Sequence, residues 1–222
     1  MITSHTSTNP FRGFTIIEMM VAIAVIAILS GVLFTAINQN ENSPRLETAQ
    51  MIVSQAFTNA RSQAILKQNR TRLIINSTEP TNEKEADAFL RYFGVIVETE
   101  PGSNQWETTL KGEYLPEGIY FIPDSSSQIV DWNEDKPDSS YSNQSMSLAF
   151  PSNQTESPGS GTNWIYYEFK NTGRMSGLNN KVVLAEGSLQ ELKPEFESPA
   201  AILGLVFNGY GLQFPLDEED TL

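Results

Sequence analysis

Cysteine is absent from the 222-residue chain, and histidine occurs once, at His5. Without cysteine there is no disulfide bond, no thiolate metal site and no cysteine nucleophile. With one histidine in a polar N-terminal stretch, neither a Ser-His-Asp triad nor a multi-histidine metal site can be assembled within one chain. The sequence also lacks a P-loop, a G-x-G-x-x-G and a G-x-S-x-G motif, and no spacing of its carboxylates singles out an acid and a base. We therefore expect no enzyme activity, no catalytic residues and no cofactor.

Basic side chains are scarce, since 14 Lys and Arg stand against 27 Asp and Glu, a formal net charge of −13. The imbalance is uneven: residues 1–72 carry a net charge of +3, and residues 73–222 carry −16. A body this acidic repels phosphate backbones, so we do not expect a nucleic acid partner.

Apolar residues dominate one long run, FTIIEMMVAIAVIAILSGVLFTAI, which covers residues 14–37 with Glu18 as its only charge. As a helix it would measure about 36 Å, enough to cross a hydrocarbon core of about 30 Å. No A-x-A cleavage site follows the run, so we predict a transmembrane helix that the mature protein keeps. Arg12 precedes the run and the first charge after it is acidic, Glu41, which places the N-terminal side in the cytoplasm and the body outside.

A second, amphipathic helix is predicted over residues 38–69. Ser43 is a suitable N-cap, and Pro44 suits the first helical position. Small and apolar residues then recur at steps of three and four, which forms one continuous stripe. The stripe consists of Leu46, Ala49, Val53, Ala56, Phe57, Ala60 and Ala64. The helix is expected to end near Lys67, Gln68 and Asn69.

Strand-like segments replace the helical period after Asn69. They are rich in β-branched and aromatic residues and cover 70–76, 90–99, 106–111, 118–122, 145–150, 164–170, 181–185 and 201–207. Two stretches dense in Ser, Asp, Asn, Gly and Pro, 124–143 and 151–163, are predicted surface loops. The predicted fold class is α+β: a long N-terminal helix, with a transmembrane half and an amphipathic half, packs on a mainly antiparallel β-sheet domain of residues 70–216. Residues 217–222 form an acidic tail.

The segment GFTIIE at residues 13–18, preceded by Arg12, resembles the type III signal of type IV pilins and type II secretion pseudopilins. The resemblance implies a pilin-like fold and a leader of residues 1–13, which prepilin peptidase removes by cleavage between Gly13 and Phe14. The same enzyme would N-methylate Phe14. Glu18 matches the glutamate at mature position five, which in these families pairs with the free N-terminal amine of an adjacent subunit and sets the axial register.

Glu18 also stands out on physical grounds, because a carboxylate at mid-membrane costs roughly 2.5–3.5 kcal/mol on insertion scales. The alternative is a tolerated interfacial glutamate in an ordinary signal anchor. Residues 30–31, Ser-Gly, interrupt the same run. They fit a flexible or closely packed point in a helix bundle, and equally the ordinary Gly and Ser content of membrane helices.

Two motifs in the body point to a subgroup. FTNARSQAILKQN at 57–69, followed at once by a strand, resembles the GspH/FimT-like group, and YEFKNTGR at 167–174 resembles that group's Phe-x-x-x-Gly-Arg hairpin. Arg61 and Arg174 fit a contact with another subunit or a structural role. We favour the structural role, with Arg61 a solvated helix residue and Arg174 part of the turn after Gly173.

An acidic loop, DWNEDKPD at 131–138, superficially suggests calcium binding. Lys136 and Ser142 stand where an EF-hand needs glycine and glutamate, so that loop type is excluded. A calcium site of another kind stays open, although a solvated acidic loop is the favoured interpretation. The acidic run at 217–220 is interpreted as a solubilising tail.

Taken together, the resemblance implies a minor pseudopilin-type subunit of a type II secretion pseudopilus. Its partners would be prepilin peptidase and other pilins or pseudopilins, which it contacts through the N-terminal helix. It would lie in the bacterial inner membrane as a single-pass protein with its C-terminal domain in the periplasm. One alternative is a type IV pilus minor pilin of the FimT/FimU type, active in pilus assembly, adhesion or DNA uptake. Another is an uncleaved, singly anchored periplasmic binding protein or enzyme that begins at Met1.

Overall fold

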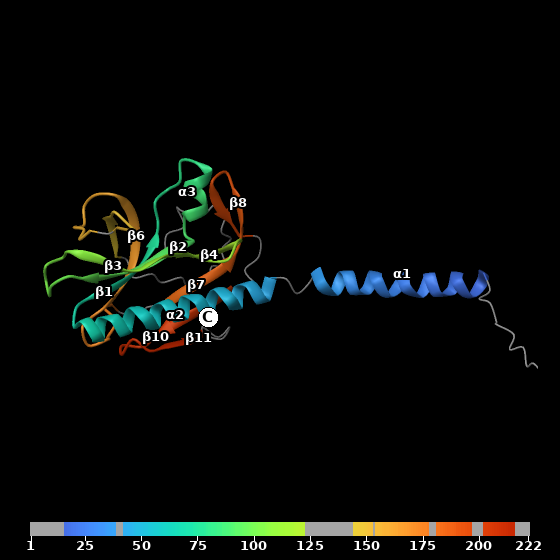
Figure 1. The fold of residues 1–222 in the computed structure, drawn as a ribbon, viewed down its shortest axis with the longest axis horizontal. Coiled ribbons are helices and arrows are strands. Elements are labelled where there is room, and N and C mark those ends of the chain that lie inside the picture. Colours follow the sequence, from blue (N-terminus) through green and yellow to red (C-terminus); the bar gives the residue numbers. More distant parts are fainter. Residues whose placement is uncertain are drawn as a thin grey trace, which may run out of the picture. The chain divides into compact units, whose positions relative to one another are not determined.

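The computed structural model describes residues 16–38, 42–122, 144–152, 154–177, 181–196 and 202–215. The chain divides into two compact units, residues 1–41 and residues 42–222. Figure 1 shows the helix of the first unit and the mixed α and β elements of the second.

The first unit contains one helix, α1 (Ile16–Asn38), which continues through the Ser-Gly pair at 30–31 without a break. Eight of its large apolar side chains are between 48% and 83% exposed: Ile16, Ile17, Met19, Met20, Val21, Ile23, Val25 and Ile26. They fall on all sides of the helix, so α1 has no separate polar face in this part. None of the helices in the described part of the chain combines the length and the apolar character that a membrane crossing needs.

The second unit begins with α2 (Asn42–Lys67). Its start differs from the sequence prediction, because the helix already includes Ser43, the predicted N-cap. Pro44 still lies in the first turn, where its missing N–H breaks no helical hydrogen bond. The end is confirmed at Lys67, followed by Gln68 with a left-handed φ of 57°, which terminates the helix. Every member of the predicted stripe from Leu46 to Ala64 is buried, at most 4% exposed, which confirms the predicted packing face.

Two antiparallel sheets make up most of the rest, and all eight predicted strands are present. A five-stranded sheet has the order β3-β2-β1-β6-β5, and a four-stranded sheet has the order β11-β10-β7-β4. The first contains β1 (Thr71–Asn76), β2 (Tyr92–Glu98), β3 (Trp106–Tyr114), β5 (Ser145–Leu148) and β6 (Thr162–Phe169). The second contains β4 (Ile119–Phe121), β7 (Lys181–Glu186), β10 (Ile202–Phe207) and β11 (Gln213–Pro215). The predicted α+β class with a mainly antiparallel sheet is confirmed.

Four short elements escaped the sequence analysis: α3 (Glu83–Ala88), β8 (Ser188–Gln190), β9 (Lys193–Glu195) and the edge strand β11. Three of them are strands of three residues, too short to show a period. The six-residue α3 did carry a signal, since the Asn82 side chain accepts a hydrogen bond from the Glu85 N–H at 3.0 Å. An Asn followed three residues later by Glu is a helix-start pattern.

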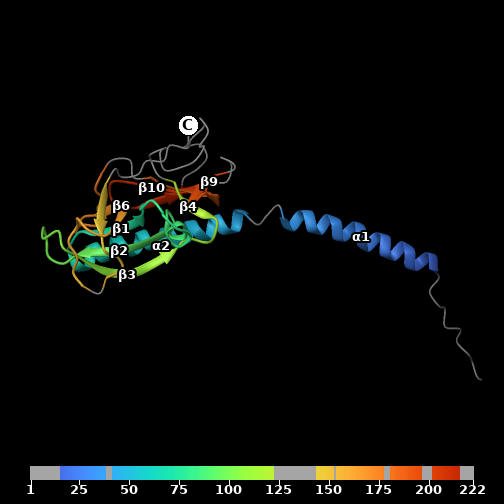
Figure 2. The same cartoon turned by 90° about the horizontal axis from the view of Figure 1, so that it is seen from above.

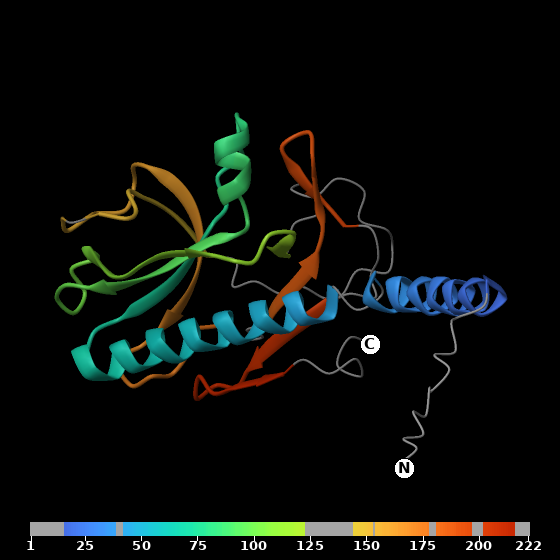
Figure 3. The ribbon, with the colours of Figure 1, turned by 45° about the vertical axis from the view of Figure 1, so that its right-hand side comes forward.

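The main core lies between α2 and both sheets, and Figures 2 and 3 show α2 running along them. Phe57 is at its centre, with ring centroids 5.2 Å from Tyr167, 6.3 Å from Phe169 and 4.4 Å from Phe207. Because Tyr167 and Phe169 belong to the five-stranded sheet and Phe207 to the other, this one side chain joins the two sheets to the helix. Aromatic pairs at such distances add to the free energy of apolar burial.

The opposite face of the five-stranded sheet is also covered. A second apolar cluster contains Ile74, Ile96, Trp106, Met146, Leu148 and Trp164. Strand β1 is consequently buried along its whole length, with Leu73 and Ile75 towards α2 and Ile74 towards the second cluster. This explains why β1 shows little alternation of apolar and polar residues.

The structure describes one of the two predicted surface loops and not the other. Residues 151–163 are largely irregular where described, but β6 already begins at Thr162, and Glu156 forms an isolated bridge with Trp106. The other predicted loop, 124–143, lies outside the described residues, as do the leader 1–13 and the tail 217–222.

Candidate functional site

The structure describes only part of the predicted processing and assembly site. Gly13 and Phe14, the residues on either side of the predicted cleavage, lie outside the described part of the chain. Glu18 is described, and it is an exposed residue in the first turn of α1. A carboxylate there is favoured by the positive end of the helix dipole. Around it, α1 presents exposed apolar side chains, so this end of the helix combines one acidic group with a large apolar surface.

Arg61 and the Gly173-Arg174 turn, which come from the two body motifs, meet in space. Arg61 Nε donates a hydrogen bond to the Gly173 carbonyl oxygen at 3.3 Å across 112 residues of sequence. The interpretation of Arg61 as a solvated helix residue is therefore wrong, because the side chain is half-buried and holds this turn against α2. Arg174 does belong to the turn, as predicted, and it is exposed.

Two structural features favour glycine at position 173. Its φ is +75°, a left-handed conformation, and a Cβ atom there would come within 2.7 Å of Ile65 Cδ1. Both the backbone conformation and the contact with α2 disfavour a larger residue. The glycine of the hairpin motif is thus explained by its backbone conformation and its packing.

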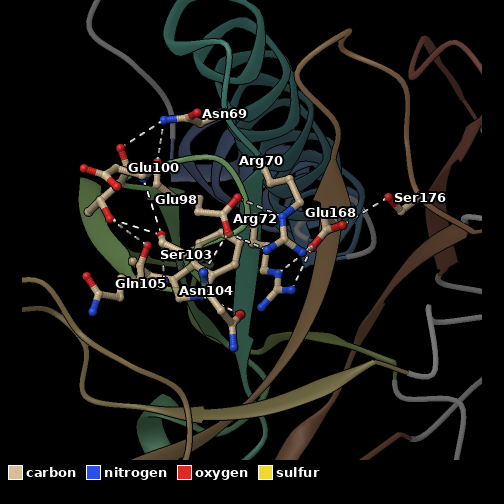
Figure 4. A network of polar contacts seen from close by, with 12 residues as sticks. Asn69, Arg70, Arg72, Glu98, Glu100, Ser103, Asn104, Gln105, Glu168 and Ser176 are labelled. Atoms are coloured by element: carbon tan, nitrogen blue, oxygen red, sulfur yellow. Dashed lines mark hydrogen bonds and ion pairs between the residues drawn. The ribbon is translucent and has the colours of Figure 1, made fainter.

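A polar network fixes the exit from α2, as Figure 4 shows. The Asn69 side chain donates to the carbonyl oxygens of Glu98 and Thr99 at 2.9 and 3.2 Å. Arg70 forms two hydrogen bonds with the Glu98 carboxylate, one of them at 2.8 Å from Nε to Oε2. The backbone N–H of Asn104 donates to the same carboxylate at 2.8 Å. The end of the helix, the end of β2 and the β2–β3 turn are therefore held together by hydrogen bonds.

The pKa values of Arg70 and Glu98 depend on both burial and hydrogen bonding. Burial of Glu98, whose side chain is fully covered, raises the pKa of its carboxyl. Hydrogen bonds from Arg70 and from the backbone N–H groups of Asn104 and Gly102 outweigh burial and hold that pKa below its ordinary value. The hydrogen bond to Glu98 in turn raises the pKa of Arg70. Both groups are charged at neutral pH, as a structural ion pair requires.

Arg72 continues the network into the second apolar cluster. Its guanidinium carbon lies 4.0 Å from the ring centroids of both Trp106 and Tyr166. Its Nε donates to Glu168 Oε2 at 2.8 Å, and Ser176 Oγ donates to the other oxygen at 3.2 Å. Arg72 is only 6% exposed, so it is a buried, paired and stacked cation.

Sequence analysis missed this network. The available signal was two arginines flanking a threonine, RTR at 70–72, immediately before an apolar strand. Their partners, Glu98 and Glu168, are 28 and 96 residues away, so no local pattern connects them. The network is remote from α1 in sequence.

A shallow groove of about 610 Å³ runs between β3 and residues 151, 152, 154 and 155. Its lining consists of Glu107, Thr108, Thr109, Lys111, Pro151, Ser152, Gln154 and Thr155. These eight residues include one carboxylate, one ammonium group and no aromatic ring. Across the described residues no cluster of three or more potential ligands could hold a metal ion. The acidic loop 131–138, considered for calcium, lies outside those residues.

Comparison with known protein families identifies a motif in the N-terminal region. Residues 8–34 match the family model described as the prokaryotic N-terminal methylation motif. By this motif, the chain is type IV pilin-like. The match includes Gly13, Phe14 and Glu18, the three residues on which the sequence prediction rests. No curated protein and no solved structure is significantly similar to the chain.

The pilin-like assignment agrees with the fold, an N-terminal helix followed by a mainly antiparallel β-sheet domain. The motif implies processing by prepilin peptidase, assembly with other pilins and a membrane anchor. It is common to pilus and pseudopilus subunits, so the type of fibre and the GspH/FimT-like subgroup remain predictions from the body motifs.

Proposed function

We propose that this pilin-like chain is a minor pseudopilin-type subunit of a type II secretion pseudopilus, cleaved between Gly13 and Phe14 and assembled through α1. The observation that carries the proposal is the methylation motif at residues 8–34, which includes most of α1, a helix with exposed apolar side chains. The acidic, cysteine-free body favours a minor subunit over a bulk fibre subunit. The function is mechanical, and no catalytic step is assigned to the chain.

Assembly in this proposal depends on the packing of α1 against the helices of neighbouring subunits. Lipid tails are as apolar as the side chains of α1, so van der Waals packing, and not transfer from water, holds such helices together. Contact between bare apolar side chains has little directional character, so it does not by itself set the axial position of one helix against the next. A charge within the apolar surface does, because it is stabilised only opposite a partner. We assign that role to Glu18, with the N-terminal amine of Phe14 in a neighbouring subunit as the partner.

Cleavage and assembly are coupled on this view. The amine of Phe14 exists only after the leader of residues 1–13 has been removed. An unprocessed chain would present Glu18 without the amine that fixes the register. The helix would still be apolar, but it would lack the pairing that selects one axial position.

The first experiment is intact-mass and N-terminal peptide mass spectrometry on the chain from the membrane fraction. We expect a mature protein that begins at N-methylated Phe14, and the unprocessed precursor in a strain without prepilin peptidase. A chain that begins at Met1 in both strains would contradict the proposal and favour an anchored binding protein or enzyme. Co-purification with pilus subunits, instead of pseudopilus subunits, would identify the type IV pilus minor pilin.

The variant Glu18→Ala tests the register mechanism. Because alanine cannot pair with the N-terminal amine and leaves that amine without a charge partner in the apolar surface, we expect a loss of roughly tenfold or more in fibre incorporation with processing largely intact. Glu47→Ala, an exposed glutamate on α2, is the matched control. Normal fibre or secretion yield with Glu18→Ala would contradict the role of Glu18.

A further inference from the structure

Strand β3 lies at the edge of the five-stranded sheet, whose order is β3-β2-β1-β6-β5. One side of β3 pairs with β2. On the other side, Trp106 forms an isolated bridge with Glu156, in which the N–H of each residue donates to the carbonyl oxygen of the other at 2.8 Å. An edge strand presents backbone donors and acceptors that a further strand can use.

Among the described residues, the segment that faces β3 does not continue this ladder at Thr108. Alternate residues of a strand direct their N–H and C=O groups to the same edge, and the pairing of β3 with β2 is regular from Trp106 to Thr108. The backbone of Thr108 therefore faces the same edge as that of Trp106. There the Ser152 N–H donates to the side-chain oxygen of Thr108 at 3.3 Å, and the Gln154 N–H donates to Ser152 Oγ at 3.0 Å. The facing segment thus uses its N–H groups on side chains and turns away from the strand.

Open space lies beside this part of the strand. The groove of about 610 Å³ is lined by Thr108 and Thr109 on the side of β3. Thr109 Oγ1 is buried and has no hydrogen-bond partner in the part of the chain that the structure describes. Five of the eight described lining side chains carry a hydroxyl or an amide and no charge: Thr108, Thr109, Ser152, Gln154 and Thr155. An extended polypeptide suits such a site, because its backbone pairs with the strand while alternate side chains enter the groove.

Two opposite charges line the same groove. Glu107 and Lys111 are both exposed and lie four residues apart on β3, which corresponds to about 13 Å. On a strand added antiparallel to β3, an acid opposite Lys111 and a base four residues later, opposite Glu107, would each face the opposite charge. Cross-strand pairs of opposite charge stabilise a sheet, and like charges directly opposite each other destabilise it. The charges therefore select both the sequence and the direction of an added strand.

We propose that β3 accepts an extended segment of a different protein as an additional antiparallel strand. The segment carries Ser, Thr, Asn or Gln at its centre, an acid opposite Lys111 and a base opposite Glu107. Main-chain hydrogen bonds to Thr108 supply affinity, and the side chains in the groove supply specificity. The inference goes beyond the proposed function, since strand addition requires neither cleavage after Gly13 nor α1. It suits a minor subunit, because each copy holds one partner in a contact that does not repeat along a fibre.

A second copy of this chain is a poor occupant of the site. Antiparallel pairing of two β3 edges requires a two-fold axis perpendicular to the sheet. Figures 2 and 3 show α2 lying along the sheets, so this axis would make the two α2 helices run in opposite directions. Residues 39–41 alone separate α1 from α2, so one membrane would have to anchor two chains whose α2 helices begin at opposite ends of the dimer. We therefore assign the site to a different protein.

A designed heptapeptide tests the contact with a defined probe. The probe is TTDTSTK, with a fluorophore on its N-terminus and an amide at its C-terminus, and its isomer TTKTSTD exchanges the two charges. Antiparallel alignment places the third residue opposite Lys111 and the seventh opposite Glu107. Fluorescence anisotropy with the full-length chain in detergent should show binding of TTDTSTK below about 1 mM, and binding of the isomer about fivefold weaker.

N-methylation of the probe backbone separates strand addition from simple charge attraction. The sixth residue of the probe lies opposite Thr108, so its N–H points to β3, whereas the N–H of the fifth residue points away. N-methylation of the sixth residue should weaken binding about tenfold or more, since it removes a hydrogen bond and places a methyl group between the strands. N-methylation of the fifth residue is the matched control and should change binding by less than about twofold.

Charge reversal on the chain locates the site. Lys111→Glu should abolish the preference for TTDTSTK over TTKTSTD, because each peptide then presents one acid and one base to two carboxylates. Lys84→Glu, an equal change of charge at an exposed position on α3, should leave the preference unchanged. No binding of either peptide up to about 1 mM would overturn the proposal. Equal losses from the two N-methylations, or the same response to Lys111→Glu and Lys84→Glu, would also overturn it.

The oligomeric state of the same samples distinguishes a second copy from a different protein. Light scattering in detergent measures the mass of the chain with and without the probe. We expect Lys111→Glu and Lys84→Glu to leave this mass equal to that of the unmodified chain. A dimer that dissociates with the probe and with Lys111→Glu, but persists with Lys84→Glu, would assign β3 to a second copy and overturn the proposal.

Discussion

The two long helices are similar in length, but the apolar side chains of one are exposed and those of the other are buried. In α1, of 23 residues, the described apolar side chains up to Ile26 are exposed, whereas α2, of 26 residues, buries its whole stripe against two sheets. The stripe of α2 is mostly alanine with one large ring, Phe57, so the helix backbone can approach the strands closely. The apolar residues of α1 are bulky and surround the helix. We infer that α2 stabilises the body and that α1 is built to pack against other molecules.

The strongest test of this contrast is Phe57→Ala. Removing a fully buried ring that contacts both sheets should lower the free energy of unfolding by about 3–5 kcal/mol. Chemical denaturation of the full chain in detergent, followed by tryptophan fluorescence, measures it. Gln55→Ala, at an exposed position on the same helix, is the control. A loss below about 1 kcal/mol would mean that α2 does not hold the sheets together.

A second prediction concerns Glu98. Its pKa is lowered in the folded chain, so its ionised form adds stability above the unfolded value of about 4.3, and this is lost as pH falls through the folded pKa. Glu98→Gln should therefore cost about 1–3 kcal/mol at neutral pH, and the difference should shrink towards zero in acid.

Urea titrations at pH 7 and near pH 3.5 measure this difference. Glu100→Gln, in the exposed β2–β3 turn, changes the same charge without a buried partner and should have little effect at either pH. If the cost of Glu98→Gln were equal at both pH values, the ion pair with Arg70 would not be its source.

Gly173→Ala should have a smaller effect, about 1–2 kcal/mol, because alanine is strained at a left-handed φ and its methyl group would displace Ile65. Thermal unfolding is the measurement. Gly209→Ala is the natural control, since Gly209 has no left-handed φ and open space around its Cα. Equal shifts of the melting temperature in the two variants would show that the contact between this turn and α2 is dispensable.

The smallest expected effect is that of Ile23→Ala. Ile23 is 64% exposed and belongs to the first compact unit, so unfolding of the body should change by less than about 0.5 kcal/mol. Fibre incorporation should fall instead. A large change in the free energy of unfolding of the body would contradict the separate roles assigned to α1 and α2.

Regular local patterns were sufficient for most of the secondary structure. The three- and four-residue steps from Leu46 to Ala64 predicted both the helix and its buried face, because helical geometry repeats every 3.6 residues. Eight strands, among them the three-residue β4, were predicted from composition and turn residues. Three other strands of three residues, β8, β9 and β11, were not, because their pairing depends on neighbours supplied by the tertiary fold.

The candidate sites also divide into those that a local segment predicts and those that depend on contacts between distant segments. Gly13, Phe14 and Glu18 were predicted from one continuous segment, since a peptidase reads a short local sequence and needs no folded body. The contact between Arg61 and the turn at Gly173 was not predicted, because the two residues lie in segments 112 positions apart. The resemblance at 57–69 and 167–174 identified both segments but did not indicate that they touch.

By itself, the sequence determined the methylation motif, the apolar character of α1, the buried stripe of α2 and the acidic character of the body. Each of these depends on residues that are close together along the chain. Only the tertiary structure decided that β1 lies between β2 and β6, with Arg72 opposite Glu168 and stacked between Trp106 and Tyr166. These contacts join residues up to 96 positions apart, and they form only when apolar burial on both faces of the sheet has set the strand order and register.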